Sequence, residues 1–138
     1  DGMIARAGLE KYVRWIGYVD EIDKPLLYRN AEAFVFPSRH EGFGLPPLEA
    51  MASGTPVVAG DAGSLPEVIG TGGFLVDPDD VRNMAGAIIS IVLQEPLAAD
   101  LRRQGPQQAA KFNWQNTAIE TLRVYDRVTK KLQVVKDK

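Results

Sequence analysis

The sequence predicts an α/β fold: a Rossmann-like parallel sheet flanked by helices, ending in long C-terminal helices. Four short runs of apolar or β-favouring residues have the length of strands. Segments with helical periodicity lie between and after them, and strands that alternate with helices favour a parallel sheet covered on both faces. The 138 residues, of which 45% are hydrophobic, suffice for one domain with a buried core.

The expected strands lie in the first half of the chain. The β-rich segment KYVRWI (11–16) ends at Gly17 and forms the first strand. The runs AFVF (33–36) and PVVA (56–59) are apolar and too short for helices, which favours buried strands. The run GGFLV (72–76) is the fourth expected strand.

Short helices are expected between these strands. Residues 21–30 carry leucines on a helical pattern, and either Asp20 or Asp23 could cap this helix. A helix of roughly two turns fits residues 46–53, because a proline pair suits a first helical turn and a glycine follows as C-cap. Residues 64–69 form a third helix with Ser64 as N-cap of a capping box.

Longer helices are expected in the C-terminal half. Residues 79–93 repeat apolar side chains at helical spacing, and Asp79 and Asp80 fit the cap and first turn. A second helix covers residues 97–112, weakened by an internal glycine–proline pair. Asn113 then caps the last helix.

Composition narrows the class of protein. The formal net charge is −2 and no basic block occurs, so a nucleic-acid partner is not expected. The absence of cysteine excludes a disulfide scaffold and a thiolate metal site and fits a reducing, cytoplasmic compartment. No window approaches the about 18 apolar residues that a membrane span requires.

The most informative stretch is RHEGFGLPPLEAMASG (39–54), where a glycine turn leads into the short helix. Gly42 and Gly44 let a ligand approach main-chain N–H groups closely, and the positive end of the helix faces this turn. An anion such as a diphosphate is therefore expected here. Glu41 and Glu49 bracket the turn and suit hydroxyl-rich groups, since carboxylates accept hydrogen bonds from sugar hydroxyls.

Glu41 and Glu49, with seven residues between them in EGFGLPPLEAMASGTPVV, resemble the E-x7-E motif of retaining family-4 (group 1) glycosyltransferases of the GT-B architecture. The resemblance continues through SLPEVIG, GGFLVDPDD and FNWQNTAIETLRVYDRV, so it covers nearly the whole chain. It implies a C-terminal, donor-binding domain that binds a UDP- or GDP-linked sugar as substrate for retaining transfer, with no cofactor and no metal. The version PPLEAMA is similar to that of mannosyltransferases, with a glucosyl or other hexosyl donor as the alternative.

The resemblance also implies what lies outside this sequence. No segment matches the family's first strands of the donor domain, its loop with an Arg and a Lys, or its N-terminal acceptor domain. Residues 1–138 are therefore expected to be one nucleotide-sugar-binding domain of a two-domain enzyme, inactive alone. The acceptor (a glycan, lipid or small molecule) and any peripheral contact with the cytoplasmic membrane face would involve the missing domain. The alternative function is a nucleotide-sugar-binding module without turnover of its own.

The matching positions receive roles from the family. The resemblance implies that Glu41 is the catalytic residue, which faces the donor sugar and stabilises charge at the reacting carbon. Glu49 would accept hydrogen bonds from the ribose hydroxyls. The main chain of four residues would bind phosphate and sugar: Gly42, Phe43, Gly44 and Leu45. The turn at Gly17 and Tyr18 would lie beside the nucleobase.

Structural alternatives stand beside these roles. Glu49 could be a first-turn glutamate favoured by the helix dipole, and Glu41 an exposed loop residue. The Phe43 ring could be plain core, and Tyr18 a surface tyrosine. His40 is the sole histidine and could line the sugar pocket, but has no partner for metal ligation.

Two charged features near the turn have less specific signals. Arg39 could help bind phosphate. The run Asp77-Pro78-Asp79-Asp80 superficially resembles an acidic metal motif of another glycosyltransferase architecture, but helix capping explains these aspartates.

Overall fold

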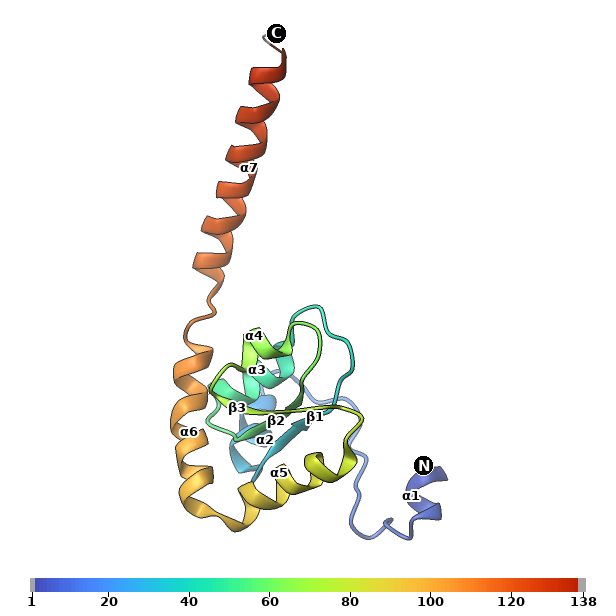
Figure 1. Cartoon of the computed structure of the whole chain (residues 1–138). Coiled ribbons are helices and arrows are strands. Elements are labelled where there is room, and N and C mark those ends of the chain that lie inside the picture. Colours follow the sequence, from blue (N-terminus) through green and yellow to red (C-terminus); the bar gives the residue numbers. More distant parts are fainter. Residues whose placement is uncertain (1, 137–138) are drawn as a thin grey trace.

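The computed structural model describes residues 2–136, with side chains described up to residue 129. Its centre is a sheet of three parallel strands in the order β1 (Phe34–Phe36), β2 (Val57–Gly60) and β3 (Gly73–Val76) (Figure 1). In its register, Val35 lies opposite Val58, and Val58 opposite Phe74. The parallel α/β class is confirmed, with three strands in place of the four expected.

Residues 11–16 do not form the expected first strand. Their aromatic side chains are exposed, Tyr12 to 83% and Trp15 to 85%, and this segment pairs with none of the described strands. Aromatic and β-branched residues favour a strand only where a neighbouring strand and a packed face receive them. The prediction from local composition was therefore wrong at this position.

Helices cover both faces of the sheet (Figure 1). One face packs against α2 (Lys24–Asn30), α3 (Leu45–Ala52) and α4 (Leu65–Ile69). The other face packs against α5 (Val81–Leu93) and the first half of α6 (Glu95–Ala109), whose last residue, Ala109, joins the cluster of the first layer. The result is the expected arrangement of a parallel sheet between two helical layers.

Side chains along β2 alternate between these layers. Val57 and Ala59 join Met51 of α3 in one core cluster, whereas Val58 joins Ile91 of α5 in the other. All five are at most 2% exposed, and burying a side chain of the size of Met51 or Ile91 contributes about 1.5–3 kcal/mol. The central strand is thus buried on both faces, as a parallel sheet requires.

The helical ends agree in part with the sequence. Asp80 caps α5, because its carboxylate accepts a hydrogen bond from the Asn83 N–H at 3.0 Å. Asn113 caps α7 (Trp114–Lys136) in the same way, through the Asn116 N–H at 2.8 Å. The helix α6 continues through Pro106 to Ala109.

The remaining two helices lie apart from the sheet. α1 (Gly2–Arg6) has no buried residue, and α7 projects away from the layers (Figure 1). In the described part of the chain, no single helix is long and apolar enough to cross a membrane; α5 and the segment Glu95–Thr129 meet the requirement only as a pair bent by 98°.

Candidate functional site

The loops that follow β1, β2 and β3 meet at the carboxyl edge of the sheet. The hydroxyl of Ser64, after β2, donates to the carbonyl oxygens of Phe43 and Glu41, after β1, at 2.7 and 3.1 Å. The guanidinium of Arg39, also after β1, pairs with the carboxylate of Asp79, after β3. In open parallel sheets this edge is where ligands bind.

The turn before α3 presents main-chain N–H groups that have no partner. Within the described part of the chain, the N–H groups of four consecutive residues donate no hydrogen bond: Gly42, Phe43, Gly44 and Leu45. Gly44 is itself buried, and buried N–H groups are normally paired. These amides are therefore available to an acceptor from outside the chain.

The proline pair limits the number of free N–H groups that α3 adds to these four amides. α3 begins at Leu45, so Pro46 and Pro47 occupy its second and third positions. Neither has an N–H group, and the next amide, of Leu48, already donates to the Gly44 carbonyl oxygen at 3.3 Å. Leu45 is the one residue of the first turn with a free amide, and the other three belong to the loop.

The two glycines of the turn differ in what they require. Gly44 has φ +107°, and a Cβ there would lie 2.7 Å from Cδ2 of Leu65, so both backbone and space demand glycine. Gly42 has no left-handed φ, and a Cβ there would meet nothing within 4 Å. Gly42 therefore needs no glycine for its backbone angle, and the open space beside its Cα leaves room for a ligand to approach the main chain.

Glu41 is held by its main chain. Its carbonyl oxygen accepts from Ser64, and its side chain is half-buried, not exposed as the structural alternative requires. Its carboxylate makes no hydrogen bond or ion pair with the described residues. Both of its oxygens are therefore open to a ligand.

Glu49 is the fifth residue of α3, and the first turn of this helix contains no acidic residue. The alternative of a first-turn glutamate is therefore wrong. The half-buried carboxylate faces α2, where the hydroxyl of Tyr28 donates to Oε2 at 3.1 Å. Oε1 accepts no hydrogen bond from the described residues, so this oxygen is available to a ligand.

The groups around Glu49 on α2 respond to its charge. Burial, followed by the negative charge of Glu49 and the hydrogen bond to it, raises the pKa of Tyr28 to about 12. The pKa of Lys24, one turn earlier, is raised by its hydrogen bond to Glu21 and then by charges that include Glu49 and Tyr18. Lys24 therefore lies within electrostatic range of both Glu49 and Tyr18.

The structure corrects the surroundings of the Gly17 and Tyr18 turn. The two residues do not end a strand; they lie in a segment without regular structure. Gly17 has φ +70°, and Tyr18 is 83% exposed. The contact of this turn with a nucleobase stays a prediction.

Phe43 is not plain core. Its ring is 41% exposed and packs edge-to-face against Phe112, with centroids 5.7 Å apart. Beside it opens an apolar pocket of about 330 Å³, whose lining includes neither predicted glutamate. The lining residues are Phe43, Leu45, Leu48, Phe112, Asn113, Trp114 and Thr117. Sequence reasoning did not find this pocket, because its two halves lie some 65 positions apart along the chain.

The remaining charged residues near the turn show no sign of a role in ligand binding. Arg39 pairs with Asp79. Capping is confirmed for this acidic run, but the cap of α5 is Asp80 and not Asp79, and Asp80 does not lie in the first turn as expected. His40 is exposed, and its carbonyl oxygen accepts from Ser38 at 3.3 Å. Among the described residues, no group of three or more His, Asp or Glu side chains could hold a metal ion.

Known proteins share both sequence and fold with this chain. Residues 1–108 match the family model described as "Glycosyl transferases group 1". The O-antigen chain mannosyltransferase B of Escherichia coli is 40% identical over 123 residues, which cover 89% of this chain and 32% of that protein. The chain thus spans about a third of the length of this relative.

Solved structures agree with the sequence match. Sucrose-phosphate synthase of Thermosynechococcus elongatus superposes with a TM-score of 0.84 at 32% identity, over 94% of this chain and 33% of that one. HepE of Anabaena, solved in complex with UDP and glucose, superposes with a TM-score of 0.74 at 26% identity, over 96% of this chain and 34% of that one. The family model covers most of the chain, and the chain belongs to the group 1 glycosyltransferases of the GT-B fold.

Proposed function

We propose that this chain is the sugar-donor-binding domain of a retaining glycosyltransferase, and that it binds a UDP- or GDP-linked sugar at the glycine turn. The observation that carries the proposal is the row of four unpaired amides between two half-buried glutamates. A diphosphate supplies acceptors for such a row, and sugar hydroxyls supply hydrogen-bond donors for the carboxylates.

The proposed division of labour follows from charge. Negative charge builds on the diphosphate as the glycosidic bond breaks, so amides fixed around it stabilise the transition state more than the ground state. Glu41 faces the sugar and stabilises positive charge at the reacting carbon. Glu49 binds the ribose hydroxyls at the other end of the sugar donor, and Tyr18 lies beside the base.

The relatives support the choice of ligand. HepE structures contain UDP, and in another complex UDP-glucose, while several relatives in sequence are mannosyltransferases. In this proposal the nucleotide sugar is the substrate and no resident cofactor takes part. The acceptor, a glycan, lipid or small molecule, binds a separate domain of the complete enzyme, which works in the cytoplasm or at the cytoplasmic membrane face.

The test is a panel of UDP- and GDP-linked sugars assayed for product with the full-length protein and candidate acceptors. Transfer from one sugar nucleotide, with the anomeric configuration kept in the product, supports the proposal. Tight binding of a sugar nucleotide without transfer or hydrolysis would favour the binding module. Failure to bind any UDP- or GDP-linked compound would overturn both.

A further inference from the structure

We propose that Tyr28 is a positioning residue for Glu49: its hydroxyl occupies one carboxylate oxygen and turns the other toward the vicinal hydroxyls of the nucleotide. The inference rests on the proposed function, because it assumes that Glu49 meets the sugar donor. Its first support is the hydrogen bond from the Tyr28 hydroxyl to Oε2 of Glu49, 3.1 Å long and partly buried. No other described side chain donates to this carboxylate.

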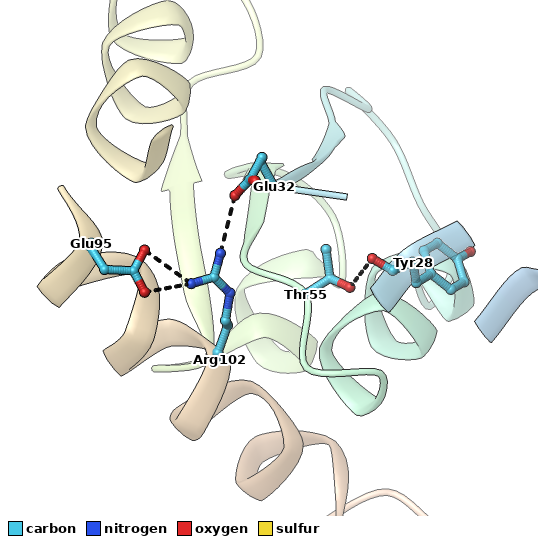
Figure 2. A network of polar contacts seen from close by, with 5 residues as sticks. All are labelled: Tyr28, Glu32, Thr55, Glu95 and Arg102. Atoms are coloured by element: carbon cyan, nitrogen blue, oxygen red, sulfur yellow. Dashed lines mark hydrogen bonds and ion pairs between the residues drawn. The ribbon is translucent and has the colours of Figure 1, made fainter. Parts of the chain in front are cut away.

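Tyr28 can orient Glu49 because it is itself fixed at two other points. Its ring packs edge-to-face on Phe34 of β1, with centroids 5.3 Å apart. Its carbonyl oxygen accepts a hydrogen bond of 2.6 Å from the hydroxyl of Thr55, a residue only 2% exposed (Figure 2). The position of the Tyr28 hydroxyl is thereby fixed relative to the sheet. A group held in this way can keep a carboxylate in the orientation that ligand binding requires.

The protonation state of Tyr28 suits this role. Burial and the charge of Glu49 raise the pKa of Tyr28 to about 12, so the phenol stays protonated, and a hydrogen-bond donor, at neutral pH. A tyrosine hydroxyl satisfies one oxygen of the carboxylate without neutralising its charge. The free oxygen, Oε1, can only accept, so a ligand meeting it must present O–H or N–H groups. Ribose offers two neighbouring hydroxyls of this kind.

The variant Tyr28→Phe removes the hydroxyl and keeps both the ring on Phe34 and the carbonyl that Thr55 binds. We expect it to weaken binding of UDP or GDP, whichever the full-length protein prefers, by about threefold to tenfold, the range for one hydrogen bond. Calorimetric titration measures the dissociation constant, and thermal unfolding checks that the fold is kept. Tyr125→Phe, on the exposed part of α7, is the matched control and should bind as wild type does.

Two comparisons separate positioning from mere support of the fold. Tyr28→Phe should have no further effect in a Glu49→Gln background, and none on the 2′,3′-dideoxy form of the same nucleotide, which lacks the hydroxyls that Glu49 would meet. Additive losses in the double variant, or equal losses with the dideoxy nucleotide, would overturn the inference.

The remaining outcomes distinguish failure of the role of Tyr28 from failure of the proposed function on which it rests. Wild-type affinity in Tyr28→Phe together with weakened binding in Glu49→Gln overturns the role of Tyr28 and leaves the proposed function standing. Unchanged affinity in Glu49→Gln removes the proposed contact, and with it the role of Tyr28.

Discussion

The hydroxyl of Ser64 lies 2.7 Å from the carbonyl oxygen of Phe43, so the start of α4 holds the glycine turn in place from the neighbouring loop. This hydroxyl was expected to cap its own helix, but it makes no capping hydrogen bond there. Instead it lies between the carbonyl oxygens of Phe43 and Glu41. The turn is therefore shaped by a residue more than twenty positions away.

Ser64→Ala tests this support. Loss of the hydroxyl leaves the Phe43 carbonyl oxygen without its donor, whereas the Glu41 carbonyl oxygen keeps the main-chain N–H of residue 64 at 3.4 Å. We expect the free energy of unfolding to fall by about 0.5–1.5 kcal/mol. Nucleotide affinity should fall as well, because the unpaired amides lose their fixed geometry. Urea unfolding and calorimetric titration of the full-length protein measure the two effects. Ser53→Ala removes a hydroxyl that makes no hydrogen bond with the described residues, and it should change neither.

The glycines of the turn should separate folding from binding. Gly44→Ala forces a side chain into a left-handed backbone and against Leu65, so we expect a loss of about 1–3 kcal/mol of stability. Gly42→Ala meets open space and should change stability by less than about 0.5 kcal/mol. If a diphosphate lies against this amide, Gly42→Ala should still weaken sugar-nucleotide binding. Wild-type affinity in a stable Gly42→Ala protein would argue against a ligand there.

The two glutamates should fail in different ways. We expect Glu41→Ala to lower kcat with little change in KM, because Glu41 stabilises charge that develops during transfer. Glu49→Ala should mainly weaken nucleotide binding, by about 1–3 kcal/mol. Steady-state kinetics with the preferred sugar nucleotide, using Glu120→Ala on α7 as control, distinguishes them. Equal and negligible effects would contradict both assignments.

Tyr28 should also make the stability of the protein decrease at high pH. Its pKa is about 12 in the folded chain and about 10 in an unfolded one, so the folded state favours the protonated phenol. This contribution is fully present below pH 10 and is lost as the pH rises toward 12. Urea unfolding of wild type and Tyr28→Phe between pH 9 and pH 12 should give curves that converge over this window. Parallel curves would contradict the burial and charge assigned to this hydroxyl.

The sequence predicts the features that depend on residues close together in the chain, and it does not predict those that depend on distant residues. The runs that became β1, β2 and β3 were placed within two residues of their observed ends, because an apolar run bounded by turn residues is a local signal. The expected strand at 11–16 was wrong, because pairing is decided by neighbours that local composition does not describe.

The candidate site divides in the same way. The glycine turn and its two glutamates follow from a motif contained in sixteen consecutive residues. The partners that hold the turn and Glu49, namely Ser64 and Tyr28, are joined to it by contacts over more than twenty positions. One chain without its relatives carries no signal for such pairs, so only the folded structure reveals them.

The two prolines at the start of α3 have a spectroscopic consequence. Because Pro46 and Pro47 carry no amide proton, they are silent in a proton–nitrogen correlation spectrum. A diphosphate docking here should shift the resonances of residues 42–45, whereas Leu48, already committed to Gly44, should shift little. Four consecutive residues whose peaks shift together, followed by two residues without peaks, would show directly how much of the site is occupied by ligand.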